Sequence, residues 1–195
     1  MNNKIIAIAA ITYDGILGVD NQLAVKSSYD MNWFKTKTTG NTVLMGRKTF
    51  ESMGSKGLPN RDNIVVTTQD LGHTDHTFYY TNSLMNAFKY QTQKEKRSDL
   101  YVIGGAELYK QLIPMCDEVY LTIFKPVDPT TEWAFWSYDN AVYFPYSPNL
   151  TEFQDDAHFG QRFGICSINQ FFQKYEILDR FEAIDHRGIV VRFSK

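Results

Sequence analysis

An acidic residue and two aromatic residues share one face of a helix predicted near the start of the chain. Asp30, Trp33 and Phe34 are spaced i, i+3 and i+4, and Lys37 continues the same face at i+7. A solvated carboxylate normally lies opposite such an apolar face. Asp30 is therefore a candidate for an acid held in an apolar pocket. The alternative is a first-turn acid that only favours the helix dipole.

A second group of residues is suited to binding phosphate. The short apolar run Val43-Leu44-Met45 predicts a buried strand that ends at Gly46. Arg47-Lys48-Thr49 then brings two cations and a hydroxyl to the start of a new helix, where anions bind favourably. The alternative for this tripeptide is a solvated helix start.

Two further features could contact a ligand. Gly104-Gly105 follows an apolar run and permits a close backbone approach, although the pair equally fits a tight turn and lacks the full G-x-G-x-x-G pattern. Arg61 lies in a Gly- and Pro-containing loop, where most arginines are only surface residues. The chain has no Ser-His-Asp order, nucleophile elbow or P-loop. One acid, a phosphate site and a glycine pair favour redox chemistry with a phosphate-bearing cofactor.

The composition excludes several classes of function. A formal net charge of -2 over 195 residues gives no strong electrostatic basis for binding nucleic acid or an anionic membrane. No apolar run approaches membrane-spanning length, and the N-terminus does not open a signal peptide. Cys116 and Cys166 have neither framework nor metal spacing, so we expect reduced thiols and a cytoplasmic location. His73 and His76 lack a third ligand, so no metal site is expected.

Predicted strands and helices alternate along the chain. The predicted strands are Ile5 to Ile11, Val43 to Met45, Asn63 to Thr68, Leu100 to Ile103, Glu118 to Phe124, Lys174 to Phe181 and Gly188 to Phe193. The first predicted helix is capped by Ser27 or Ser28 and ends near Gly40, and the second begins after Gly46. Two more helices are predicted from Ser83 to Tyr90 and from Ala106 to Ile113. Residues 70 to 80 are expected to be irregular.

This alternation predicts one α/β domain over residues 1–195, with a mainly parallel central sheet flanked by helices and closed by antiparallel C-terminal strands. Residues 125 to 170 are expected to form a long decorated loop with a short strand. Ligands of open α/β sheets bind beyond the carboxyl ends of the strands. Thr12, Gly46, Thr67, Thr68 and the glycine pair are all expected there.

Several of these segments, taken in order, resemble dihydrofolate reductase. The resemblance covers most of residues 5 to 124, and a weaker similarity continues at Phe144-Pro145 and Tyr175 to Leu178. Its motifs are Ile8-Ala9-Ala10, Gly18, Asp30 with Trp33-Phe34-Lys35, Met45 to Ser52, Leu58-Pro59-Asn60-Arg61, Val102-Ile103-Gly104-Gly105 and Leu121-Thr122.

The resemblance implies NADPH-dependent reduction of 7,8-dihydrofolate to tetrahydrofolate, and antifolates as inhibitors. Asp30 would accept hydrogen bonds from the pterin and promote protonation of N5, with Thr122 bonded to its carboxylate and Leu23 in a mobile loop over the nicotinamide. Arg61 would hold the glutamate α-carboxylate. The other residues implied to bind substrate are Ile8, Met31, Phe34, Lys35, Met53, Leu58 and Ile103.

The resemblance also implies which residues bind NADPH. Arg47, Lys48 and Thr49 would face the phosphates, and Thr68 would join Arg47 near the 2′-phosphate. Gly104-Gly105 resembles the family's cis glycine pair. The remaining residues implied to bind cofactor are Ala10, Gly18, Gly46, Thr67, Ala106 and Tyr109.

The chain departs from the family in a few places. Ala24-Val25 stands where the family usually has Pro-Trp, and Glu107 stands where a cation is common. We expect a divergent branch of the family, such as a virus-encoded one, and a monomer or weak homodimer. Two alternatives stay open: a reductase of a ribosylaminopyrimidine in riboflavin biosynthesis, and a catalytically idle structural subunit with the same fold.

Overall fold

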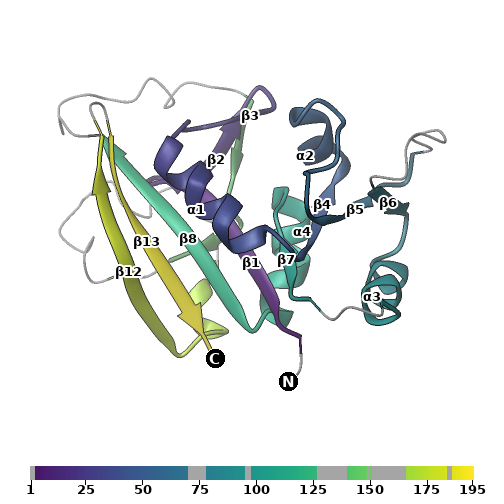
Figure 1. The fold of residues 1–195 in the computed structure, drawn as a ribbon. Helices are drawn as coiled ribbons and strands as arrows, with labels where there is room; N and C mark the ends of the chain where they lie inside the picture. Colours follow the sequence, from purple (N-terminus) through teal and green to yellow (C-terminus); the bar gives the residue numbers. More distant parts are fainter. Residues whose placement is uncertain are drawn as a thin grey trace. The chain divides into compact units, whose positions relative to one another are not determined.

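The described part of the chain forms two compact units. The computed structural model describes residues 3–69, 78–94, 98–126, 140–148, 150, 166–183 and 186–195 (Figure 1). Unit 1 comprises Met1–Ile8 and Asn32–Asp117, and unit 2 comprises Ala9–Met31 and Glu118–Lys195. Strand β1 (Ile5–Thr12) and helix α1 (Ser28–Thr38) contribute residues to both units.

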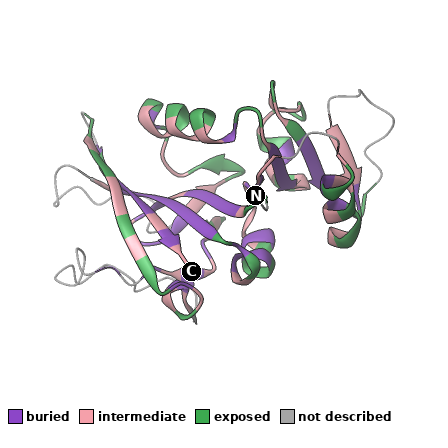
Figure 2. Cartoon of the chain, turned by 60° about the horizontal axis from the view of Figure 1, so that its bottom comes forward, coloured by how far each residue is buried: buried purple, intermediate pink, exposed green. Residues whose placement is uncertain are grey.

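Unit 1 is built on parallel strands. The first residues of β1 pair with β7 (Leu100–Val102), which pairs with β4 (Thr42–Gly46); β5 (Asp62–Val66) and β6 (Phe78–Thr81) follow, and every pairing is parallel. β4, β7 and the middle of β5 are largely apolar and buried, as expected of a sheet with covered faces, whereas three of the four residues of β6 are only half-buried (Figure 2). The helices of this unit are α2 (Arg47–Ser52), α3 (Leu84–Thr92), α4 (Ala106–Leu112) and the short 3₁₀ helix η1 (Ile113–Met115).

Unit 2 is built on long antiparallel strands. β13 (His186–Ser194) pairs on one side with β8 (Glu118–Pro126) and on the other with β12 (Lys174–Glu182). A register shift between Ile177 and Asp179 marks a β-bulge in β12. The smaller elements are β2 (Ile16–Val19), β3 (Gln22–Leu23) and β9 (Ala141–Tyr143) in one sheet, β10 (Tyr146–Ser147) with β11 (Cys166–Ser167), and the 3₁₀ helix η4 (Ile168–Gln170).

The predicted fold class is confirmed. Because β1 is common to both sheets, the strand order is β12-β13-β8-β1-β7-β4-β5-β6, with parallel strands on the β6 side and antiparallel strands at the β12 end. Among the described residues, no helix has the length and apolar character needed to cross a membrane.

Asp20 and Asn21 form the turn of the β2–β3 hairpin, and both have positive φ, as a tight hairpin turn requires. Two local predictions were wrong or incomplete. Part of the segment expected to be irregular is β6, whose Phe78 and Tyr79 rings pack against Phe50 and Tyr90. Tertiary ring contacts override weak local periodicity there.

The segment from 125 to 170 holds more regular structure than predicted. Its described part contains β9, β10 and β11, and β9 pairs with β2. The remaining predictions on this segment, together with His73 and His76, lie outside the described residues. Cys116 is a free, buried thiol whose Sγ donates to the carbonyl of Leu112.

Candidate active site

The candidate acid of unit 2 lies in the first turn of α1. Asp30 is half-buried, and the Thr122 hydroxyl in β8 donates a hydrogen bond to its carboxylate. Burial raises the pKa of Asp30 above the ordinary range of an aspartate, and the bond from Thr122 lowers it by a smaller amount. Thr122 itself is buried. A first-turn role alone does not account for this contact with a distant strand.

Four other predicted residues of unit 2 lie on β1, β2, β3 and α1. Ala10 is a half-buried residue of β1, and Leu23 pairs with Gly18 across the β2–β3 hairpin. A Cβ on Gly18 would collide with the Gln22 carbonyl, so the hairpin requires glycine at this position. Leu23 and Met31 are exposed large apolar side chains, each 49% accessible. Because Leu23 pairs with Gly18, it belongs to the short strand β3 and not to a loop.

The candidate phosphate site of unit 1 begins where β4 ends. Gly46 precedes Arg47, Lys48 and Thr49, which open α2. The Arg47 guanidinium forms an ion pair with Glu51 one turn later, with Nη1 2.6 Å from Oε1. This i, i+4 pair is partly exposed, so an incoming phosphate would compete with Glu51 for the guanidinium.

The glycine pair lies against the same helix start. The Gly104-Gly105 peptide is cis, as the resemblance implies, and Gly104 has φ +114°. The Gly46 N–H donates to the Gly104 carbonyl at 2.7 Å. A Cβ on either glycine of the pair would lie 3.4 Å from Thr49 Oγ1, so a side chain there would crowd the Thr49 hydroxyl.

The other residues predicted to bind the cofactor in unit 1 lie in α4 and after β5. Tyr109 is buried in α4, and its hydroxyl donates to the Ile8 carbonyl at 2.7 Å. Ala106 begins α4. Beyond the end of β5, Thr67 is buried and its hydroxyl accepts from the Gln69 N–H, whereas Thr68 is exposed.

Arg61 is held in place by three hydrogen bonds. Its Nε donates to Thr38 Oγ1 and its Nη1 to the Pro59 carbonyl, both at 2.8 Å, and its Nη2 lies 3.5 Å from the Lys35 carbonyl. The guanidinium carbon is 5.8 Å from the centre of the Phe34 ring. Burial lowers the pKa of Arg61. A guanidinium carries five N–H donors, so two remain to bind a carboxylate.

The other predicted substrate residues of unit 1 lie on several elements. Leu58 is half-buried, and its backbone is held on both sides by the Asn63 side chain. Met53 follows α2, Ile103 follows β7, and Lys35 is an exposed residue of α1. Ile8 is buried in β1.

Comparison with known proteins identifies the family. A family model described as dihydrofolate reductase matches residues 4–160. The chain belongs to the dihydrofolate reductase family. The dihydrofolate reductase of Haemophilus influenzae is 37% identical over 135 residues, which cover 66% of this chain and 81% of that protein. The Bacillus subtilis dihydrofolate reductase is 39% identical over 118 residues, covering 59% of this chain and 66% of that protein.

A solved structure extends the likeness to nearly the whole fold. The dihydrofolate reductase from Enterococcus faecalis, complexed with NADP(H) and RAB-propyl, has a TM-score of 0.66 and 22% sequence identity. The superposition covers 98% of this chain and 96% of that one. At this identity the likeness concerns the fold, and it includes elements beyond residue 160.

Sequence reasoning missed two contacts at this dihydrofolate reductase site. The ion pair between Arg47 and Glu51 could have been expected from their i, i+4 spacing. The hydrogen bond from the Tyr29 hydroxyl to Asp179 could not, because the two residues are far apart in the sequence. Tyr29 directly precedes the candidate acid Asp30.

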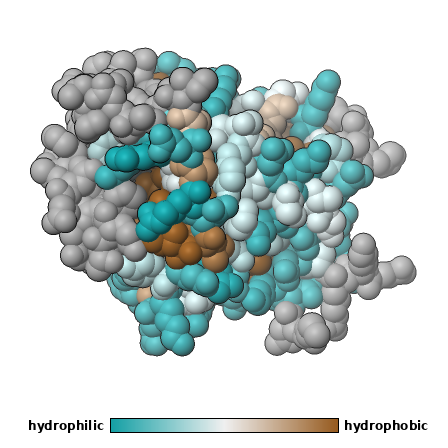
Figure 3. Space-filling model, turned by 60° about the vertical axis from the view of Figure 1, so that its left-hand side comes forward, coloured by the Kyte–Doolittle hydropathy of each residue, from teal (hydrophilic) through white to brown (hydrophobic). Residues whose placement is uncertain are grey.

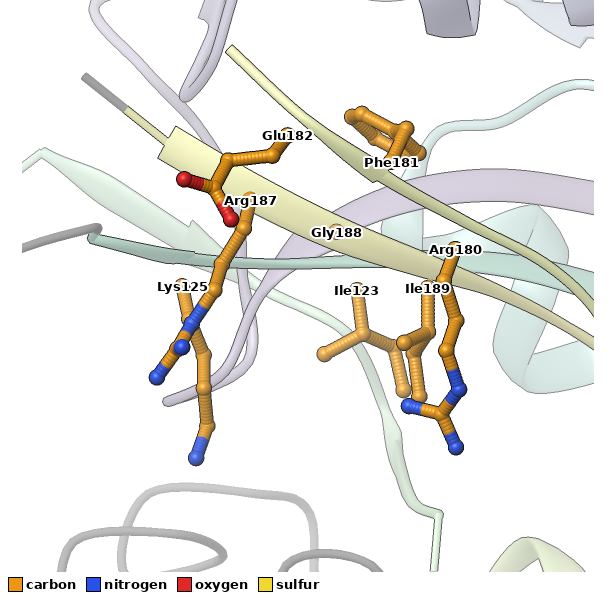
Figure 4. Close-up of a pocket in the computed structure, with 8 residues that line it drawn as sticks. All are labelled: Ile123, Lys125, Arg180, Phe181, Glu182, Arg187, Gly188 and Ile189. Atoms are coloured by element: carbon orange, nitrogen blue, oxygen red, sulfur yellow. The ribbon is translucent and has the colours of Figure 1, made fainter. Parts of the chain in front are cut away.

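A surface groove of about 490 Å³ in unit 2 contains none of the predicted site residues. It is formed by β8, β12 and β13 and is lined by Ile123, Lys125, Arg180, Phe181, Glu182, Arg187, Gly188 and Ile189. In Figure 4, Lys125 and Arg187 lie side by side, and Arg180 lies on the other side of the two isoleucines. A space-filling view of one face shows an apolar area bordered by hydrophilic residues, without identifying it with this groove (Figure 3). Because no predicted site residue lines the groove, the groove is not part of the candidate active site.

Proposed function

We propose that this chain catalyses the reduction of 7,8-dihydrofolate to 5,6,7,8-tetrahydrofolate with NADPH. The observation that carries the proposal is the half-buried carboxylate of Asp30, hydrogen-bonded to Thr122, in a member of the dihydrofolate reductase family. An acid of raised pKa is suited to promoting proton transfer near neutral pH.

Asp30 would orient the pterin and help to protonate it. Its carboxylate would accept hydrogen bonds from the pterin 2-amino group and N3, and it would promote protonation at N5. Burial favours the neutral acid and the Thr122 hydroxyl favours the carboxylate. Met31, Phe34 and Ile103 would supply apolar contacts to the substrate rings.

Unit 1 offers a set of groups that fits a phosphate-bearing dinucleotide. The side chains of Arg47, Lys48 and Thr49 follow β4, and the backbone of Gly104 and Gly105 has no Cβ to block a close approach. NADPH supplies the hydride when it is bound. Arg47 and the exposed Thr68 would hold the 2′-phosphate, which distinguishes NADPH from NADH.

Arg61 would bind the glutamate α-carboxylate of the substrate. Three hydrogen bonds fix the guanidinium within unit 1, which leaves a planar fork for bidentate binding. Lysine could not reproduce this geometry, because an ammonium group is a point charge without a fork.

The direct test is an assay of the purified protein for dihydrofolate-dependent oxidation of NADPH. The absorbance of NADPH should fall only when dihydrofolate is added, and methotrexate should abolish the change. Oxidation with a ribosylaminopyrimidinone but not with dihydrofolate would support the riboflavin-pathway alternative, and no oxidation with either would support an idle subunit. Family membership favours neither alternative.

We also propose that residues 1–195 act as one domain, as a monomer or weak homodimer in a cytoplasm, without nucleic acid or membrane partners. The near-neutral net charge supports the last point. Sedimentation at micromolar concentration would test the oligomeric state.

A further inference from the structure

The first turn of α1 carries Asp30, and none of its residues is fully buried. Of the eleven residues of α1, all of which the structure describes, only Thr38 in the last turn is buried. The N–H of Asp30 lies 3.5 Å from Ser27 Oγ, which is a long capping bond. Helix ends fray unless side chains hold them, so the position of Asp30 depends on specific contacts of this turn.

Tyr29, the residue before Asp30, also holds this turn in place, through contacts with β12. Its hydroxyl donates a hydrogen bond to the Asp179 carboxylate in β12. Its ring stacks on Phe181, with centroids 4.2 Å apart and an interplanar angle of 17°. Burial, followed by the bond to Asp179, raises the pKa of Tyr29 to about 12, and the same bond is the main cause of a lowered pKa at Asp179. Tyr29 therefore stays a neutral donor at physiological pH.

The partners of Tyr29 and Asp30 lie in one row across the sheet of unit 2. Thr122 in β8 is opposite Val190 in β13, and Val190 is opposite Asp179 in β12. Directly opposed residues face the same side of a sheet, and two strand spacings separate Thr122 from Asp179 by roughly 10 Å. The short side chain of Asp30 reaches the nearer residue of this row, and the long side chain of Tyr29 reaches the farther one.

A β-bulge in β12 brings Asp179 into this row. Val191 is opposite Ile177 while Val190 is opposite Asp179, so Leu178 is the extra residue. Without the bulge, Leu178 would face Val190 and the carboxylate would point to the other side of the sheet.

Gly188 makes room for the ring on which Tyr29 stacks. It lies opposite Phe181 in the β12–β13 pair, and a Cβ at this position would lie 2.7 Å from Phe181 Cε1. The Phe181 side chain lies on one side of the strands, and those of Ile123 and Ile189 lie on the other (Figure 4). The ring contacts of Tyr29 are therefore built on the face that carries Thr122, not on the groove face.

We propose that Tyr29 and Asp179 are positioning residues for Asp30. Their hydrogen bond holds the first turn of α1 on β12 and keeps the Asp30 carboxylate within hydrogen-bonding reach of Thr122. This inference rests on the proposed function for its kinetic consequences. Its structural consequence, the protonation of Asp30, can be measured without any turnover.

The kinetic test compares Tyr29→Phe, Asp179→Leu and the double variant with wild-type protein. Tyr29→Phe keeps the ring that stacks on Phe181 and removes only the hydroxyl. Each single variant should lower kcat about five- to tenfold, the size expected for one lost hydrogen bond, and the double variant should show no further loss. NADPH affinity should stay unchanged. Asp179→Asn keeps an acceptor oxygen and should recover most of the activity.

The direct test follows the Asp30 carboxyl by carbon-13 NMR titration. Loss of the Tyr29 bond should weaken the Thr122 bond, so the pKa of Asp30 should rise further in Tyr29→Phe and return towards the wild-type value in Asp179→Asn. The Asp179 carboxyl and the His186 ring also lie beside this contact, so residue-specific signals are needed.

Tyr79→Phe is a matched control. Tyr79 in unit 1 also stacks on another ring, that of Tyr90 at 4.1 Å, and it lies outside the proposed site. It should change neither kcat nor the Asp30 titration. Wild-type activity and an unshifted Asp30 titration in Tyr29→Phe would overturn the inference. Failure of wild-type protein to oxidise NADPH with dihydrofolate would instead remove the proposed function.

Discussion

Thr122 in β8 donates a side-chain hydrogen bond to Asp30 in the first turn of α1. The two residues belong to distant parts of the sequence but to the same compact unit. The bond stabilises the charged carboxylate, whereas burial, the larger effect, stabilises the neutral acid. These opposite effects leave the pKa of Asp30 raised and make its protonation sensitive to small changes around it.

Replacement of Asp30 by asparagine should remove most of the activity. Asp30→Asn keeps the size and a hydrogen-bonding oxygen but cannot exchange a proton, so kcat at pH 7 should fall by about 10²- to 10⁴-fold. The NADPH dissociation constant, measured by fluorescence quenching, should change less than about twofold. An equal loss of activity and of NADPH affinity would indicate misfolding rather than a missing acid.

The same variant should be more stable than the wild type at neutral pH. In the unfolded chain Asp30 loses its proton near pH 4, while in the folded chain it holds the proton to higher pH because its pKa is raised. The folded state thus binds more protons, and the stability contributed by Asp30 is lost as pH rises from about 4 through the raised pKa. Asparagine carries no such pH-dependent loss.

Urea unfolding checks this stability prediction. The midpoint of Asp30→Asn should exceed that of the wild type at pH 7.5, and the difference should shrink as the pH falls to about 3, where Asp30 of the wild type is largely protonated in both the folded and the unfolded state. A difference that is the same at both pH values would show that ionisation of Asp30 does not penalise folding.

Arg61→Ala should weaken folate binding without affecting the cofactor. Loss of a desolvated bidentate contact to the glutamate α-carboxylate should cost about 2 to 4 kcal/mol, and Arg61→Lys should recover only part of it. Affinity for dihydropteroate, which lacks the glutamate, should be nearly unchanged in both variants. Arg187→Ala, an exposed arginine of unit 2, is the control. Equal weakening for both ligands would remove Arg61 from the carboxylate site.

Arg47 and Glu51 should set the preference for NADPH in opposite directions. Arg47→Gln should weaken NADPH binding by about 10- to 150-fold, the range for a hydrogen bond to a charged group, and should leave NADH binding nearly unchanged. Glu51→Gln frees Arg47 from its ion pair and should tighten NADPH binding by a few-fold. If both cofactors respond equally to Arg47→Gln, the guanidinium does not contact the 2′-phosphate.

Local sequence patterns predicted most of the regular elements. Buried strands such as Ile5–Thr12 and Thr42–Gly46 are continuous apolar runs, and Ser83 caps α3 as expected. Patterns failed where the signal came from partners elsewhere in the chain. The ring of Tyr79 stacks on that of Tyr90, and the short strand Ala141–Tyr143 pairs with β2. Neither contact has a local signature in the sequence.

The sequence by itself determined the family, the α/β class and the identity of the candidate acid, because spaced motifs and apolar periodicity are properties of neighbouring residues. Only the tertiary structure decided what holds that acid. The Tyr29 hydroxyl donates a hydrogen bond to a carboxylate 150 residues away, and the Thr122 hydroxyl donates one to Asp30. The register of three strands and one bulge places Thr122 and Asp179 where these bonds can form. Strand register depends on the packing of a whole sheet, so no local stretch of sequence encodes it.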